Sequence, residues 1–255
     1  MSNDNRINAI AVDINYKSTQ EFFDGRGNAN YINPLSATMY QDNQPQLVAE
    51  RDRAEKVILA EHISSSLPKR VIELGCGIGR WSWFFAEISP KIEYLGVDFS
   101  ASLITQAVEH ARLRQVPNAR FQLMSVTDIQ DEHLSLTPPF DMIIISGLML
   151  YLNDADCYAV LSHAARLCAK HGRIYLREPL ATDERLTLKE FYSEELKQNY
   201  SAIYRTTTEM DAILQFAFPS DVFSCLEWKS PFGDELANRK ETQQLYTLIS
   251  HRGDK

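Results

Sequence analysis

Cysteine is scarce and scattered in this sequence. Four cysteines occur in 255 residues, and none belongs to a Cys-x-x-Cys pair. A disulfide framework or a structural zinc site would need denser cysteines at regular spacing. We therefore expect reduced thiols and no metal site.

Long apolar runs and net positive charge are lacking as well. No stretch approaches the roughly 20 apolar residues of a membrane-spanning helix, and the pattern of a secretory leader is missing. The 34 acidic residues outnumber the 26 basic ones, which gives a formal net charge of −8, whereas a nucleic-acid surface needs a clustered basic face. These absences predict a cytoplasmic protein with no membrane partner and no nucleic-acid partner.

What is present is the composition of an ordinary globular domain. Hydrophobic residues make up 44% of the chain and charged residues 24%, enough apolar surface for one core. Residues 1–46 are polar but carry too many aromatic rings for a free tail. We expect this segment to dock as an N-terminal helical cap on a main domain at 47–255.

Short apolar runs alternate along the main domain with longer segments of helical periodicity. This alternation is typical of βαβ units in a parallel sheet. The expected strands are 70–74, 92–97, 121–124, 141–146 and 173–177, and the expected helices are 47–65, 80–88, 101–115 and 155–169.

The last third of the chain breaks this alternation. Residues 180–207 form an extra stretch after the fifth strand, long enough to be functional. A helix at 208–216 and strands at 222–228 and 244–249 follow, and the polar segment between these strands permits antiparallel pairing. The sequence predicts an α/β fold with a doubly wound, mostly parallel seven-stranded sheet, an N-terminal helical cap and an insert after strand 5.

A glycine-rich turn joins the first expected strand to its helix. In the segment Glu73-Leu-Gly-Cys-Gly-Ile-Gly-Arg80, glycines at positions 75, 77 and 79 allow a tight turn and close approach of a ligand. Asp98 ends the next strand, where a carboxylate can bind a ribose. A nicotinamide or flavin site expects Gly-x-Gly-x-x-Gly, and Glu73 would repel a pyrophosphate but attract a cationic ligand.

Four segments resemble the motifs of class I S-adenosylmethionine-dependent methyltransferases. Val71-Ile-Glu-Leu-Gly-Cys-Gly-Ile-Gly-Arg80 is similar to motif I of that family, and Tyr94-Leu-Gly-Val-Asp-Phe-Ser100 to motif II. Phe140-Asp-Met-Ile-Ile-Ile-Ser146 and His171-Gly-Arg-Ile-Tyr-Leu-Arg-Glu178 resemble the fourth-strand and fifth-strand motifs. The resemblance covers roughly residues 47–178 and implies a Rossmann-like methyltransferase fold with S-adenosyl-L-methionine as cofactor.

The resemblance also implies roles for individual residues. Asp98 would hold the ribose hydroxyls, although it could simply cap the next helix. Arg80 would pair with the donor carboxylate, or else be a solvated first-turn cation. The family often has an acidic residue beside the adenine, where this chain has Ser125, with Asp128 as a substitute candidate. The expected cofactor-binding set is Glu73, Gly75, Gly77, Gly79, Arg80, Asp98, Phe99, Ser125, Val126, Thr127 and Ser146, with Tyr40 and Arg51 reaching the ligands from the covering segment 31–51.

Methyl transfer depends on an aligned nucleophile, and a general base is needed mainly when the acceptor must lose a proton. The candidates are Glu178, Tyr151 and His133. For Glu178 the alternative is a salt bridge to Arg177 or Arg185, and for His133 it is plain solvation.

We therefore expect an enzyme that methylates an oxygen or nitrogen of a small polar metabolite or natural-product intermediate. Two alternatives stay open: a protein or peptide N-terminal amine methyltransferase, and a non-catalytic binding scaffold of the same fold. The sequence leaves both a monomer and a homodimer open.

Overall fold

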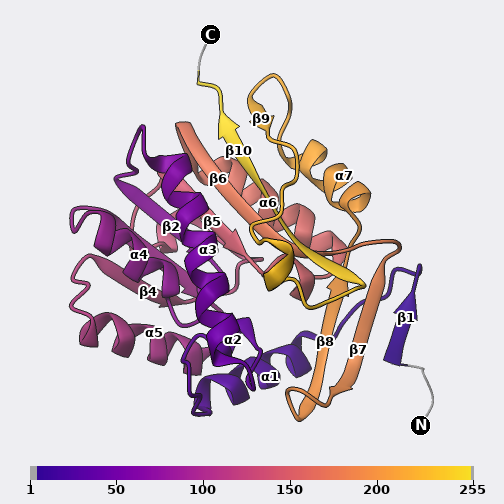
Figure 1. The fold of residues 1–255 in the computed structure, drawn as a ribbon. Coiled ribbons are helices and arrows are strands. Elements are labelled where there is room, and N and C mark those ends of the chain that lie inside the picture. The colour runs from indigo at the N-terminus through magenta and orange to yellow at the C-terminus, as the bar shows by residue number, and fades with distance from the viewer. Residues whose placement is uncertain (1–4, 254–255) are drawn as a thin grey trace.

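A seven-stranded sheet forms the centre of the computed structural model, which describes residues 5–253 (Figure 1). Its strand order is β4-β3-β2-β5-β6-β10-β9. The first five strands in that order pair in parallel, and β10 lies antiparallel between β6 and β9. The strands are β2 (Arg70–Leu74), β3 (Glu93–Asp98), β4 (Ala119–Leu123), β5 (Phe140–Ser146), β6 (Cys168–Ala181), β9 (Phe223–Cys225) and β10 (Thr242–His251). The predicted fold class is confirmed.

Helices cover both faces of this sheet, because its central strands are apolar on both sides. In β5, Ile143 and Ile145 pack in one core cluster with α6 and α7, whereas Met142 and Ile144 pack in another with α3 and α4. Such unbroken apolar runs are expected for strands buried on two faces. The helices are α3 (Pro45–Ile63), α4 (Arg80–Ile88), α5 (Ala101–Leu113), α6 (Asp154–Leu167) and α7 (Thr207–Ala217).

The N-terminal segment folds as α1 (Tyr16–Asn28) and α2 (Ser36–Met39), with α1 packed along α5. Arg26 of α1 is 1% exposed and anchors the chain around α2. Its Nε donates to the carbonyl of Ala37 at 2.9 Å, and its two terminal nitrogens donate to Asp42 at 3.1 and 2.7 Å. The proposed division at residue 46 stays a prediction, and residues 1–4 and 254–255 of the two expected units lie outside the described residues.

The segment expected as an insert forms β-structure. Residues of β7 (Leu186–Ser193) and β8 (Gln198–Tyr204) pair as an antiparallel hairpin, and β1 (Arg6–Asn8) adds to the β7 edge. Figure 1 shows this three-stranded sheet beyond the end of the main sheet, beside α1. The expected strand 222–228 is shorter than predicted, since β9 ends at Cys225. Within residues 5–253, no helix combines the length and apolar character needed to cross a membrane.

Candidate active site

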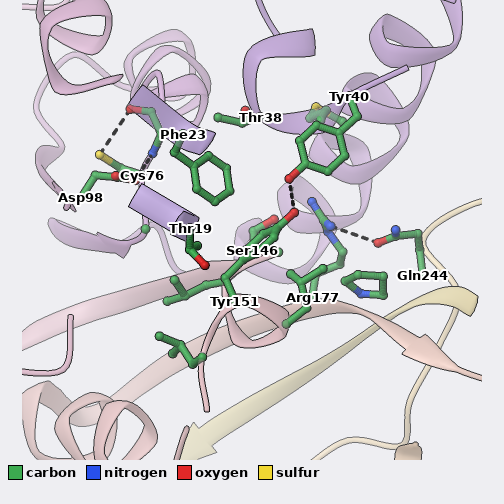
Figure 2. A pocket seen from close by; sticks show the side chains of 18 of the residues that line it. Thr19, Phe23, Thr38, Tyr40, Cys76, Asp98, Ser146, Tyr151, Arg177 and Gln244 are labelled. Atoms are coloured by element: carbon green, nitrogen blue, oxygen red, sulfur yellow. Dashed lines mark hydrogen bonds between the residues drawn. The ribbon is translucent and has the colours of Figure 1, made fainter. Parts of the chain in front are cut away.

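A cavity of about 1040 Å³ opens where the carboxyl ends of the central strands meet the N-terminal segment. The strand order gives the cavity two ends. The strands β3 and β2 lie on one side of β5, whereas β6 and β10 lie on the other side. We call the part around the β2–α4 turn and Asp98 the glycine-turn end, and the part around Arg51, Arg177 and Arg239 the arginine end. Figure 2 shows Asp98 and Cys76 on one side and Arg177 and Gln244 on the other, with Tyr151 between them.

The glycine turn is fixed by backbone hydrogen bonds to the neighbouring strand. The amides of Gly75 and Cys76 both donate to the carbonyl of Val97, at 2.9 and 3.0 Å. Gly75 and Gly77 have φ angles of 75° and 52°, which favour glycine. A Cβ on Gly77 would approach Thr38 to 2.6 Å, so the α2 segment closes directly over this turn.

Asp98 is attached to the turn by its side chain. Its Oδ2 accepts from the amide of Gly77 at 2.8 Å, and its Oδ1 accepts from the amide of Ser100 at 2.9 Å. Burial raises the pKa of Asp98 to about 6, although these backbone donors oppose the shift. The carboxylate is therefore held in one orientation at the mouth of β3, where the sequence predicts a ribose contact.

Glu73 lies beneath the turn as a buried carboxyl group. It is 3% exposed and accepts a hydrogen bond from the hydroxyl of Tyr94. Burial raises the pKa of Glu73 to about 8, although the Tyr94 hydroxyl and the Arg80 charge oppose the shift, so the side chain is largely protonated at neutral pH. A cationic ligand at this end would favour the ionised form.

Three other predicted contacts line the glycine-turn end beyond Asp98: Ser125, Val126 and Thr127, which follow β4. Phe99 also lines it, and its ring meets that of Phe23 from α1 at 6.0 Å between centroids. Gly79 does not line the cavity. It has a φ of 76°, and a Cβ there would approach the ring of Phe121 to 2.6 Å, so it allows close packing, and its cofactor contact stays a prediction.

Arg80 belongs to a buried network of ion pairs with α3. It donates to Asp52 at 2.9 Å, to Glu55 at 2.7 Å and to the hydroxyl of Ser146 at 2.9 Å. Glu55 is fully buried and also accepts from Arg177 at 3.1 Å. Burial opposes ionisation of Glu55, but the charges of Arg177 and Arg80 outweigh it and lower its pKa to about 2.

This network bears on the role predicted for Arg80. The guanidinium lines the cavity but is already neutralised by two carboxylates. Its pairing with a donor carboxylate stays a prediction, and that group would have to share Arg80 with Asp52 and Glu55. Sequence reasoning missed both partners, although their spacing of three residues places them on one face of a helix.

Phenol side chains lie between the two ends. The hydroxyl groups of Tyr40 and Tyr151 are hydrogen-bonded to each other (Figure 2). Tyr40 has a φ of 61°, an uncommon conformation for such a residue, and its ring lies 5.0 Å from the Arg26 guanidinium. Burial raises the pKa of both phenols, so both keep their protons at neutral pH, and the catalytic role expected for Tyr151 stays a prediction.

The other two predicted catalytic residues do not line the cavity. Glu178 is 1% exposed and accepts from the amides of Leu148 and Met149 at 2.8 and 3.0 Å, which holds the short helix η3 (Met149–Tyr151). His133 ends the exposed helix η2 (Asp131–His133). A base must reach the reacting proton, so this placement does not support either predicted role, and the Glu178 carboxylate instead binds the amides at the start of η3.

The arginine end contains most of what the sequence did not predict. Arg51 was expected, but Gln41, Asn238 and Arg239 were not. The last two lie in the loop between β9 and β10, which folds back onto α3. No motif marks these residues, because they meet only through tertiary packing of separate segments.

Known proteins resemble this chain in sequence and in fold. The family described as a methyltransferase domain matches residues 66–248. The tRNA (guanine-N(7)-)-methyltransferase of Brevibacillus brevis is 31% identical over 119 residues, 46% of this chain and 51% of that protein. The phosphoethanolamine N-methyltransferase of Triticum aestivum is 29% identical over 132 residues, 51% of this chain and 25% of that protein. The chain thus spans about half or less of these curated relatives.

Solved structures share the fold at low sequence identity. The 1,6-didemethyltoxoflavin-N1-methyltransferase of Burkholderia thailandensis superposes with a TM-score of 0.61 at 15% identity, covering 99% of this chain and 97% of that one. That structure contains S-adenosylhomocysteine, the demethylated form of the predicted cofactor.

The comparisons also correct one prediction. The exclusion of a nucleic-acid partner is wrong, because several relatives are tRNA methyltransferases. Net charge summed over the whole chain does not describe the charge of one site, which is the quantity that a ligand meets. Because the family match extends from residue 66 to 248, the chain belongs to the methyltransferase domain family, and its predicted assignment to the class I S-adenosylmethionine-dependent methyltransferases is confirmed.

Proposed function

We propose that this chain transfers the methyl group of S-adenosylmethionine, bound at the glycine-turn end, to an oxygen or nitrogen of a small polar acceptor bound at the arginine end. The observation that carries the proposal is the single cavity of about 1040 Å³ that joins the two ends. Sites for small molecules usually measure about 300 to 1,000 Å³. The volume is therefore sufficient for a nucleoside donor and a small acceptor together.

The glycine-turn end has the chemistry of a cationic amino-acid nucleoside. Glu73 supplies a carboxyl group whose ionisation a nearby positive charge would favour, and Asp98 presents a fixed carboxylate toward a sugar. Phe99 and Val126 supply apolar surface for a base. These groups would bind the ammonium, the ribose and the adenine of the donor in that order.

The transfer itself is a displacement at the methyl carbon. A lone pair on the acceptor oxygen or nitrogen forms the new bond to that carbon. The carbon–sulfur bond breaks, its electron pair stays on sulfur, and S-adenosylhomocysteine is released. An acceptor proton, where one must leave, passes to solvent or to a second group of the acceptor, because the buried phenols of Tyr40 and Tyr151 hold their own protons at neutral pH. The chain contributes alignment and exclusion of water.

Calorimetry with S-adenosylhomocysteine tests the donor site, and Asp98→Asn is the informative variant. Losing a hydrogen bond to a charged group costs about 1.5–3 kcal/mol, so we expect the affinity to fall by roughly tenfold or more. Asp128→Asn is the matched control, because Asp128, although the sequence offered it as a substitute adenine contact, is exposed after β4 and does not line the cavity. Wild-type protein that does not bind the nucleoside would overturn the proposal.

Mass spectrometry then tests the acceptor class. Purified protein with S-adenosylmethionine is incubated with amines, alcohols and carboxylic acids, with peptides that have a free α-amino group, and with tRNA. We expect a gain of one methyl group on a small molecule. A tRNA acceptor is the second candidate, favoured by the names of the relatives, and methylation confined to tRNA would replace the first.

A further inference from the structure

We infer that the acceptor carries an anionic group, a carboxylate or a phosphate, and that Arg51 binds it. The inference rests on the proposed function and specifies the substrate class for the arginine end. It follows from a contrast between Arg51 and the other buried arginines of the described chain.

Six arginines are buried among residues 5–253, and five of them form ion pairs. The five paired arginines and their carboxylates are Arg26 with Asp42, Arg80 with Asp52 and Glu55, Arg177 with Glu55, Arg185 with Asp154 and Glu209, and Arg205 with Asp154. Arg51 is the sixth, and no described carboxylate lies within ion-pair distance of it. A buried charge without an opposite charge beside it is costly and therefore points to a ligand.

The contacts of Arg51 leave part of its guanidinium directed at the cavity. Nε donates to the carbonyl of Leu236 at 3.0 Å, and Nη2 donates to the same carbonyl and to Asn238 Oδ1 at 2.8 Å. The nitrogen Nη1 makes no hydrogen bond to a described residue. It is not one of the buried side-chain nitrogens that lack a partner, so it is not itself buried. Since Arg51 is 9% exposed and lines the cavity, Nη1 is accessible from the cavity side.

The surroundings of Arg51 are positively charged. Burial lowers the pKa of Arg51, and the charges of Arg239 and Arg177 lower it further, with only Glu195 acting against them. Glu195 is itself paired with Arg239 at 2.8 Å. An anion at this place would neutralise a local excess of positive charge that the described side chains do not compensate.

Neutral donors complete the site. Gln244 accepts from Arg177 through its Oε1 at 3.0 Å, which leaves its amide nitrogen for a ligand (Figure 2). Gln244 and Arg177 lie on adjacent strands, β10 and β6, and both line the cavity. A guanidinium and an amide offer several parallel donors, the arrangement that suits the two or three oxygens of a carboxylate or phosphate.

The donor's own carboxylate is the competing source of such an anion. Arg51 contacts the loop that precedes β10, whereas the glycine turn follows β2, and two strands separate β2 from β10 in the sheet. The anionic group is therefore assigned to the acceptor, and the experiment must separate the two sources.

The test uses Arg51→Gln, Arg51→Lys and a matched control. Arg53→Gln removes a positive charge two residues away on the exposed face of α3. Each protein is loaded with S-adenosylhomocysteine and titrated with inorganic phosphate and with malonate at constant ionic strength. We expect anion affinity to fall by about tenfold in Arg51→Gln and by less in Arg51→Lys, which keeps the charge but loses the planar fork. Arg53→Gln should behave as wild type.

Each outcome is decisive. This inference alone is overturned if wild-type protein binds the nucleoside but neither anion. It is also overturned if Arg51→Gln binds the anions as tightly as wild type. A loss of nucleoside affinity in Arg51→Gln of tenfold or more assigns Arg51 to the donor carboxylate and overturns it as well. Arg51-dependent binding of tRNA without binding of small anions assigns the arginine end to a nucleic acid. Failure of wild type to bind the nucleoside sinks the proposed function first.

Discussion

The two ends of the cavity differ in charge and in origin. The glycine-turn end is built from two neighbouring strands and their turns, and its carboxyl groups are Glu73 and Asp98, both with raised pKa values. The arginine end is assembled from α3, β6 and the loop before β10, and its charged groups are cations. The difference teaches that one end suits a positively charged ligand and the other a negatively charged one. Glu55 separates them, because it pairs with an arginine from each side.

The largest effect is expected from Glu55→Gln, which removes this separation. Loss of one partner of a buried ion pair leaves Arg80 and Arg177 partly uncompensated and costs about 3–5 kcal/mol. Because the folded pKa of Glu55 is lowered to about 2 from an ordinary 4.5, its contribution is fully present above pH 4.5 and is lost as pH falls toward 2. Urea unfolding between about pH 2 and about pH 7 measures this, and the difference in stability between the two proteins should shrink toward the acid limit. Equal stability of both proteins at neutral pH would contradict it.

Gly79→Ala tests whether the glycine-turn end tolerates change. Its left-handed φ costs a residue with a Cβ about 1–2 kcal/mol, and crowding against Phe121 adds about 1–3 kcal/mol. Gly25→Ala is the control, since Gly25 lies within α1 and its nearest neighbour would be 4.0 Å away. We expect thermal unfolding to show a large loss for the first variant and a gain of about 0.5–1 kcal/mol for the second. Similar values for both would argue against a strained turn.

The pH dependence of nucleoside binding sharpens the charge contrast. With a pKa of about 8, Glu73 is mostly protonated at neutral pH, and a cation binds its ionised form. Affinity for S-adenosylhomocysteine should therefore rise by about eightfold between about pH 7 and pH 8.5. Glu73→Gln should abolish this rise, and Tyr94→Phe should move it to higher pH because a hydrogen bond to the carboxylate is lost. A flat wild-type profile in calorimetry would break the comparison.

The smallest effect is expected from Tyr151→Phe, at the boundary between the two ends. The variant removes one hydrogen bond, that with Tyr40, and should lower the free energy of unfolding by about 0.5–1.5 kcal/mol. Methyl transfer to the acceptor found by mass spectrometry should fall less than about tenfold, whereas a lost general base would cost about 100-fold or more. A loss of the larger size in single-turnover rates would make Tyr151 the base.

Most of the fold was predictable because its signals are local. The strand at Arg70–Leu74 and the helix at Arg80–Ile88 have the predicted bounds, since an apolar run and a glycine turn mark them. The hairpin of β7 and β8 was not predicted as such, because strand pairing depends on partners and not on local pattern alone. Glu178 illustrates the same limit for the site. It was expected directly after a strand, but β6 continues to Ala181, and only packing shows that its carboxylate accepts from the amides of η3.

The sequence by itself determined the methyltransferase family, the course of the central sheet and the glycine-turn end, because these depend on contiguous residues with spacing set by backbone geometry. Tertiary structure alone decided the arginine end. Arg51, Arg177 and Arg239 lie in separate parts of the chain, and only folding brings three like charges to one cavity and leaves Arg51 without an ion pair among the described side chains. Electrostatic environment depends on distance in space and on burial, and neither quantity is written in the order of residues.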